Sequence, residues 1–137
     1  RDGLMLVAVT LNAPDDWNDH ISLINRGFNT YKNRLVVSAG EYVGARSVAG
    51  GTVETVALIA AEDFIYSLAD DEVITLVQSG YDFVYAPVLA GYDAGYMYVL
   101  VQDQIVGKIP LVYGETIEQR QSENMPFWKR LFGGLWN

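Results

Sequence analysis

The chain has 137 residues, half of them hydrophobic, and a formal net charge of -8 at pH 7. This length suits one modest domain, or one small domain with flanking segments. The chain has no cysteine, which excludes disulfides and thiolate metal sites. The negative charge disfavours nucleic acid as a partner, because phosphate binding needs a basic patch.

The charge is unevenly distributed along the chain. Residues 1–120 carry 7 basic and 16 acidic groups, whereas residues 121–137 carry 2 basic groups and 1 acidic group. An acidic body with a slightly basic, aromatic tail is typical of a protein held at an anionic lipid surface by one end. No segment approaches the roughly 20 apolar residues that are needed to span a bilayer.

The opening residues predict a strand, a sharp corner and a helix. The apolar run Leu4–Leu11 has β-branched members and is typical of a strand covered on both faces. Pro14 and the two acids after it favour a helix start. The helix is expected to end near Lys32–Asn33, where a polar pair can supply a basic last turn and a left-handed cap. An apolar stripe at helical spacing is formed by Trp17, Ile21, Ile24, Phe28 and Tyr31.

Gly27 lies inside this stripe and costs the helix about 1 kcal/mol relative to alanine. We interpret it as a packing residue whose bare Cα lets the helix approach the sheet closely. A strand with one helix cannot stand alone, because the strand needs neighbours on both edges and cover on both faces. The chain starts at Arg1 without a start methionine or a signal segment. We therefore expect it to be the tail of a longer protein.

From Arg34 onward, short apolar runs alternate with glycines and acidic turns, which predicts an antiparallel β-sandwich or small barrel. Turns are expected at Gly50–Gly51 and at Gln102–Gln104, and a solvated loop at Ala69–Glu72. The eight predicted strands are Leu35–Ser38, Tyr42–Val48, Val53–Ala60, Phe64–Leu68, Val73–Val77, Phe83–Val88, Tyr96–Gln102 and Ile105–Val112.

A weak internal repeat relates Ala39–Gly44 to Ala90–Gly95, since both read Ala-Gly-x-x-x-Gly before a strand. The repeat predicts a tight turn with positive φ followed by a bulge or a close crossing, once in each half of the domain. A phosphate-binding glycine loop would need a following helix. Both glycine pairs lead into strands, so the structural interpretation is favoured.

The C-terminal residues predict a polar linker over residues 119–125 and then a short amphipathic helix with one broad apolar face. Membrane contact suits this face, because indole rings prefer the headgroup level. Gly133 and Gly134 indicate that the helix folds only on the membrane. The alternative is that the face packs on the β domain or on a second copy. The predicted membrane-anchor residues are Phe127, Trp128, Lys129, Arg130, Leu131, Phe132, Leu135 and Trp136.

No catalytic, cofactor-binding or metal-binding residue is predicted. His20 is the only histidine, and one histidine cannot build a zinc site by itself, so a surface or half-buried structural role is expected. The acidic groups at Glu62–Asp63 and Asp70–Glu72 lack the spacing of a calcium loop and predict solvated turns.

The residues Arg1–Leu4 through Asn12–Pro14, then Trp17 and Gly27–Phe28, resemble the end of the penicillin-binding domain of serine-type D-Ala-D-Ala carboxypeptidases. These are the low-molecular-mass penicillin-binding proteins. In that family a Lys-Thr-Gly strand is followed by a turn, a second apolar strand and a closing helix, then by a small all-β domain and an amphipathic membrane anchor. This chain has the same order.

The family's Ser-x-x-Lys and Lys-Thr-Gly motifs do not occur in this chain. The letters of its Ser-x-Asn element match Ser122–Asn124, which lies in the polar linker without partners and is interpreted as chance. The resemblance therefore covers the arrangement of the chain and leaves the catalytic motifs outside it.

The resemblance implies a mainly β fold in three parts. Residues 1–33 would be a strand–helix remnant of the α/β penicillin-binding domain, residues 34–118 the β domain, and residues 119–137 the linker and anchor. The parent would trim D-alanine from peptidoglycan stem peptides through a serine acyl-enzyme, without a cofactor, at the outer face of the bacterial cell membrane. This fragment would be inactive alone and would serve as stalk and membrane tether.

Two alternatives stay open. The β domain could be a binding module for a cell-wall polymer or a protein partner, since tyrosine stacks on sugars and is common at interfaces. The chain could also form a homodimer by pairing Leu4–Leu11 with a second copy. The tyrosines that motivate the first alternative, which are also ordinary sheet residues, are Tyr81, Tyr85, Tyr92, Tyr96 and Tyr98.

Overall fold

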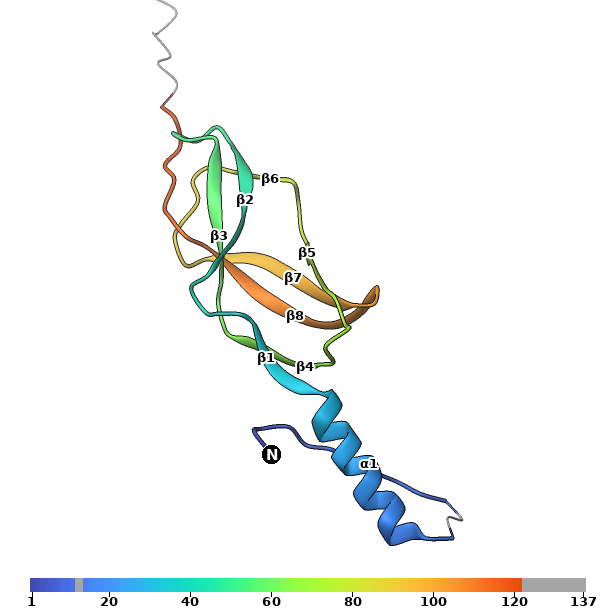
Figure 1. Ribbon diagram of the computed structural model, residues 1–137. Helices are drawn as coiled ribbons and strands as arrows, with labels where there is room; N and C mark the ends of the chain where they lie inside the picture. Colours follow the sequence, from blue (N-terminus) through green and yellow to red (C-terminus); the bar gives the residue numbers. More distant parts are fainter. Residues whose placement is uncertain (12–13, 122–137) are drawn as a thin grey trace, which may run out of the picture.

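A computed structural model describes residues 1–11 and 14–121 of the chain (Figure 1). The corner at residues 12–13, most of the predicted linker and all of the predicted anchor residues lie outside the described residues. The first residues and the only described helix form one end of the molecule, and the β domain forms the rest (Figure 1). The described chain leaves the β domain at the end opposite this helix (Figure 1).

The predicted strand Leu4–Leu11 is extended, but it joins no β-ladder within the part of the chain that the structure describes. Its even-numbered side chains are half-buried, and Leu6 lies against Gly27 of the helix. Its odd-numbered side chains are exposed, and Val7 is 84% exposed. The helix covers one face of this segment and no described strand lies beside it, so cover on the second face stays a prediction.

The helix α1 spans Asp16–Thr30 and starts two residues after Pro14, with Asp16 and Asp19 in its first turn. It ends earlier than predicted, because Tyr31 is extended and Lys32 already pairs with Leu68 in a β-ladder. The predicted basic last turn and left-handed cap are therefore wrong. A Cβ at Gly27 would lie 2.6 Å from Leu6 Cδ1, so this glycine does permit a close approach, here to the N-terminal segment.

All eight predicted strands are present, with bounds that shift by a few residues. The largest changes are at the end of β6 (Phe83–Tyr85), where Pro87 has no N–H to continue a ladder, and at the start of β7 (Asp93–Val101). The strands are β1 (Lys32–Val37), β2 (Tyr42–Ala49), β3 (Thr55–Ala60), β4 (Phe64–Leu68), β5 (Ile74–Gln78), β6 (Phe83–Tyr85), β7 (Asp93–Val101) and β8 (Gln104–Tyr113).

The strands form a two-stranded sheet, β1–β4, and a six-stranded sheet in the order β5–β7–β8–β3–β2–β6. The ladders are antiparallel except for β2–β6, which is parallel. Figure 1 shows that the six-stranded sheet curls, with β7 and β8 turned away from β2 and β3. The predicted mainly β fold class is confirmed, with one parallel pair that the sequence did not indicate.

Two apolar clusters hold the β domain together. The larger one joins Val37 of β1 to residues of the six-stranded sheet. Three of these sheet residues, Leu58, Val99 and Ile109, are completely buried. Burying one such side chain contributes about 1.5–3 kcal/mol. The smaller cluster lies at the end where the chain leaves the domain and consists of Val48, Val56, Val88 and Ile117.

The internal repeat predicts the backbone correctly in both halves. Gly40 and Gly91 have φ angles of 82° and 79°, and each opens a turn into a long strand. Gly44 and Gly95 also have positive φ, and the ladder register shifts at each of them, as in a β-bulge. The second predicted turn, at Gln102–Asp103, has positive φ at both residues, which is the conformation that matches strand twist in a two-residue hairpin.

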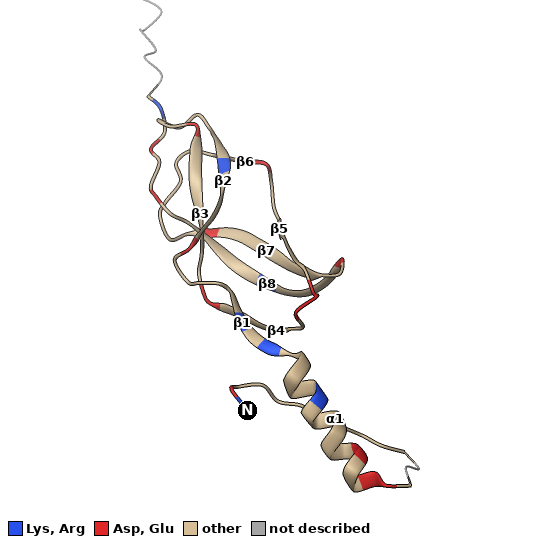
Figure 2. Ribbon diagram, viewed as in Figure 1, with Lys and Arg blue, Asp and Glu red and all other residues tan. Residues whose placement is uncertain are grey.

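Charged residues lie mostly in the loops and near strand ends, whereas most strand residues are uncharged (Figure 2). The predicted solvated loop is confirmed at Asp70 and Asp71, which are exposed, and Arg34 Nη2 lies 2.7 Å from Asp70 Oδ1. Asp63 accepts a hydrogen bond from the Ala39 N–H at 2.7 Å. Among the described residues, no helix has the length and apolar character needed to cross a membrane.

Candidate functional site

The strand–helix unit presents an open apolar face. Met5, Val7, Val9 and Leu11 are 76–90% exposed along the extended segment. On α1, two residues of the predicted stripe, Trp17 and Ile21, are also exposed. The stripe therefore covers the N-terminal segment only through its later turns. Apolar surface of this kind is typical of a contact face rather than of a catalytic centre.

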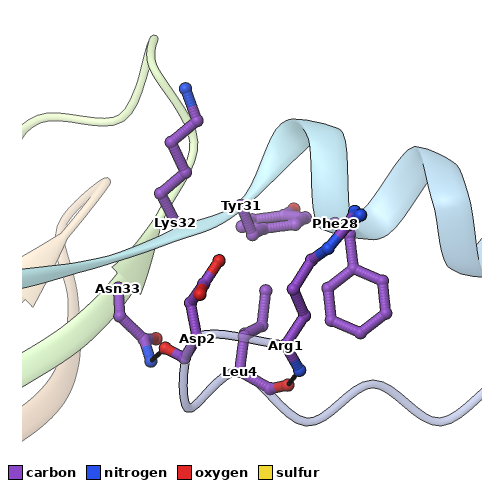
Figure 3. A pocket seen from close by; sticks show the side chains of 7 residues that line it. All are labelled: Arg1, Asp2, Leu4, Phe28, Tyr31, Lys32 and Asn33. Atoms are coloured by element: carbon purple, nitrogen blue, oxygen red, sulfur yellow. Dashed lines mark hydrogen bonds between the residues drawn. The ribbon is translucent and has the colours of Figure 1, made fainter.

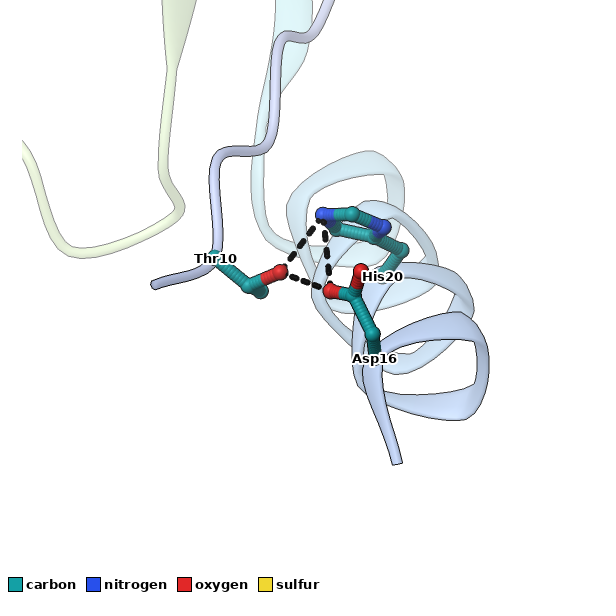
Figure 4. A network of polar contacts seen from close by, with 3 residues as sticks. All are labelled: Thr10, Asp16 and His20. Carbon is teal, nitrogen blue, oxygen red and sulfur yellow. Dashed lines mark hydrogen bonds and ion pairs between the residues drawn. The ribbon is translucent and has the colours of Figure 1, made fainter. Parts of the chain in front are cut away.

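A polar network links the N-terminal segment to the first turn of α1 (Figure 4). His20 Nε2 lies 2.9 Å from Thr10 Oγ1 and 3.6 Å from Asp16 Oδ1, and the Thr10 hydroxyl donates a hydrogen bond to the Asp16 carboxylate. A relay of the Ser-His-Asp type would need the acid at the opposite ring nitrogen. Because both partners meet the same nitrogen, the network lacks the geometry of such a relay, and His20 is half-buried, as predicted.

A cleft of about 410 Å³ lies where the strand–helix unit meets the β domain (Figure 3). Arg1 lies over the Phe28 ring, 5.8 Å from its centroid, and Asn33 Nδ2 donates to the Asp2 carbonyl at 3.1 Å. Asn33 Oδ1 also accepts from the Ser67 hydroxyl at 2.6 Å, so this side chain joins the N-terminal turn, β1 and β4. The cleft contains no nucleophile with an adjacent base and is best described as a joint between the two parts.

Arg46 of β2 is the one described charged side chain that is buried, with 6% of its surface exposed. Its Nη1 donates to the Ala94 carbonyl at 3.0 Å and its Nη2 to the Ser79 carbonyl at 3.1 Å, while its Nε has no partner among the described residues. The guanidinium therefore joins three segments of the domain. The sequence could not indicate this, because a single arginine in an amphipathic strand is typical of a solvated position.

The five tyrosines that suggested a binding surface belong to more than one element, and the binding module stays a prediction. Tyr81 and Tyr85 lie at β6, one edge of the six-stranded sheet, and Tyr96 and Tyr98 lie on β7 next to the other edge. Tyr96 is covered by Lys108, whose Nζ is 4.4 Å from the ring centroid. Beside Tyr85 stands Phe83, which the sequence pattern placed in a strand without a further role.

The remaining predictions about sites concern residues at the C-terminus and metal ligands. The predicted anchor residues, Phe127 to Trp136, lie outside the described residues and stay a prediction. Within residues 1–11 and 14–121, no group of three or more histidine, cysteine or acidic side chains is placed to hold a metal ion.

One family model of known proteins matches almost the same residues as the β domain. The family model described as penicillin-binding protein 5, C-terminal domain, matches residues 31–119, and β1–β8 all lie in this range. None of the curated proteins compared with the chain matches it.

Three solved structures share the fold. Penicillin-binding protein 5 from Haemophilus influenzae is similar with a TM-score of 0.59 and 15% identity, covering 74% of this chain and 30% of that chain. The D-alanyl-D-alanine carboxypeptidase DacD from Francisella tularensis gives 0.56 and 14%, covering 75% and 27%. The peptidoglycan synthesis regulatory factor PBP3 from Streptococcus pneumoniae gives 0.57 and 20%, covering 78% and 32%. The chain thus spans about a third or less of each of these proteins.

Proposed function

Because the chain belongs to the family of penicillin-binding protein 5 C-terminal domains, we propose that it is the accessory C-terminal region of a D-Ala-D-Ala carboxypeptidase. In this role the β domain is a stalk, and the C-terminal residues tether the protein to the outer face of the bacterial cell membrane. The parent enzyme is a serine hydrolase that trims peptidoglycan stem peptides.

One observation supports the stalk most directly. The strand–helix unit and the point where the described chain ends lie at opposite ends of the β domain (Figure 1). The Arg120 N–H donates to the Gly50 carbonyl at 2.8 Å, and Gln119 forms a bridge with Gly51, so the exit point is fixed at the β2–β3 hairpin. A spacer between a catalytic domain and a membrane needs this separation of its two attachment points.

The open face of the strand–helix unit supplies the other attachment in this proposal. Within the part of the chain that the structure describes, the segment from Leu4 to Leu11 joins no β-ladder and has an exposed face, which a sheet of the catalytic domain would cover. Neither Ser-x-x-Lys nor Lys-Thr-Gly occurs in the chain, so the chain alone would not be acylated by a fluorescent penicillin. Pairing of the segment with a second copy is the rival, and light scattering of the chain distinguishes a dimer from a monomer.

The tether is tested by deletion of residues 126–137 from the membrane-bound protein. We expect the shortened protein to move to the soluble fraction, because it loses the predicted apolar anchor face. A shortened protein that stays with the membrane would contradict the tether.

Tryptophan fluorescence gives a matched control, since the chain has 3 tryptophans. In single-tryptophan variants mixed with anionic phosphatidylglycerol vesicles, emission from Trp128 and Trp136 should shift to shorter wavelength. Emission from Trp17, which is 76% exposed on α1, should stay unchanged. A shift of the Trp17 emission alone would place the membrane contact at the wrong end of the stalk.

A further inference from the structure

Two aromatic side chains stand on the outer side of the edge strand β6. Val84 points inward and packs on the smaller apolar cluster, so the alternation of the strand turns Phe83 and Tyr85 outward. Their ring centroids are 5.3 Å apart in an edge-to-face arrangement. Phe83 is 47% exposed and Tyr85 is 72% exposed. We call these two residues the ring pair.

The side chains next to the ring pair are small and uncharged. Ser47 and Ala49 of β2 are in register with Phe83 and Tyr85, and Thr55 of β3 is in register with Ser47. No neighbour in these ladders is large enough to cover the rings from the β2 side. The hydroxyl groups of Ser47 and Thr55, both exposed, add hydrogen-bonding groups to the same face of the sheet.

The size of the ring pair argues against a protein partner. A fully covered aromatic side chain buries about 150–250 Å², so two partly exposed rings offer roughly 250 Å². A stable protein interface needs about 800 Å² from each partner. A ligand whose repeating unit is about the size of one ring fits the available surface better.

The lack of charge on these side chains further limits the chemical class of the ligand. The chain is acidic overall, with a net charge of -8, yet the ring pair and its three register neighbours on β2 and β3 carry no charge. An anionic phosphate would find no cation on these side chains, and the exposed acids Asp82 and Glu54 directly precede Phe83 and Thr55 in the sequence. A pyranose ring presents a face of C–H groups that fits the negative face of an aromatic ring, and its hydroxyls can exchange hydrogen bonds with Ser47 and Thr55.

We propose that Phe83 and Tyr85 form a docking site for neutral hexopyranose units of a glycan strand. The inference rests on the proposed function for the identity of the polymer, which is the glycan of peptidoglycan. In that setting the stalk contacts the cell wall through β6 while its two ends engage the catalytic domain and the membrane.

The test is co-sedimentation of the full chain with purified peptidoglycan sacculi, with chitotetraose as a soluble competitor. We expect the double variant Phe83→Ala/Tyr85→Ala to bind at least fivefold more weakly than the unchanged chain. Tyr42→Ala is the matched control, because Tyr42 is 62% exposed and lies seven residues, about 23 Å, from the Ala49 end of β2. It should bind within twofold of the unchanged chain, and Tyr85→Phe should also retain binding because stacking does not need the hydroxyl.

Equal sedimentation of the double variant and the unchanged chain would overturn the proposal, and so would retention that chitotetraose fails to displace. Absence of any sedimentation by the unchanged chain would overturn it as well. Each chain is first compared by thermal unfolding, so that lost binding is not confused with lost fold. Vesicle binding of the same variants separates this inference from the tether. The double variant should bind vesicles normally, whereas a chain without residues 126–137 should keep sacculus binding and lose vesicle binding.

Discussion

The strand–helix unit and the β domain bury their side chains to very different extents. No residue of α1 is buried, and Leu11 in the segment beside it is 90% exposed. In the β domain, Val56, Leu58 and Val99 are completely buried. The β domain therefore closes its own core, whereas the strand–helix unit leaves most of its side chains exposed. Substitutions at matched positions in the two regions measure this difference.

The largest effect is expected at the centre of the core. Leu58→Ala should lower the free energy of unfolding by roughly 3–5 kcal/mol, because the site is completely enclosed and cannot collapse around the cavity. Leu23→Ala on α1, where Leu23 is 50% exposed, should cost less than about 1 kcal/mol. Denaturant unfolding followed by far-ultraviolet circular dichroism measures both. Equal losses would show that the two regions share one core.

Substitution of the buried Arg46 should cause the second-largest loss in the free energy of unfolding. Arg46→Ala removes two hydrogen bonds from a charged donor and leaves the Ala94 and Ser79 carbonyls without their donor, which should cost about 2–3 kcal/mol in the same measurement. Arg34→Ala is the control, because its ion pair with Asp70 is exposed and contributes about 1 kcal/mol or less. The ranking fails if the Arg34 variant unfolds at lower denaturant than the Arg46 variant.

Two glycines give a smaller and more specific contrast. A Cβ at Gly107 of β8 would lie 2.4 Å from Phe64 Cζ, so Gly107→Ala should cost about 1–3 kcal/mol by displacing a ring between the two sheets. At Gly27 the added Cβ would meet only the flexible end of Leu6, and the gain in helix propensity, about 1 kcal/mol, offsets the contact. Thermal unfolding should show a lower Tm for Gly107→Ala alone.

The smallest effect is expected at Val7, which is 84% exposed. Val7→Lys should change the free energy of unfolding of this chain by no more than about 0.5 kcal/mol. In the parent protein the same substitution should lower stability by about 2 kcal/mol, because the catalytic sheet would then bury a charge or lose its cover. An unchanged stability of the parent would mean that this face stays open there.

The β domain was predictable because its signals are local. Alternating apolar runs marked each of the eight strands, and the glycines at positions 40, 44, 91 and 95 marked the turns and bulges. The prediction that failed concerns residues whose conformation depends on partners far away in the sequence. Lys32 and Asn33 looked like a helix end, yet pairing of β1 with β4 draws them into a sheet.

The candidate sites were likewise predictable only where the signal is local in the sequence. The half-buried His20 was predictable from its place at the edge of an apolar stripe. The ring pair was not, because alternation alone does not say whether Val84 or its two neighbours face the core. Packing of Val84 on the smaller apolar cluster decides it, and that contact is between residues far apart in the sequence. Arg46 was missed because its acceptors are backbone carbonyls, which have no side-chain signature.

The attachment of the last described residues to the β2–β3 hairpin has a mechanical consequence. A pull on the C-terminal end would first meet Arg120, whose N–H donates to the Gly50 carbonyl, and then Ile117, whose side chain is 1% exposed and whose backbone is paired with Val88. Four backbone hydrogen bonds share the load with it: Thr52 N to Glu118 O, Arg120 N to Gly50 O, Val88 N to Ile117 O and Ile117 N to Val88 O. Tension applied at the C-terminal end would thus act on these hydrogen bonds before it reached β8.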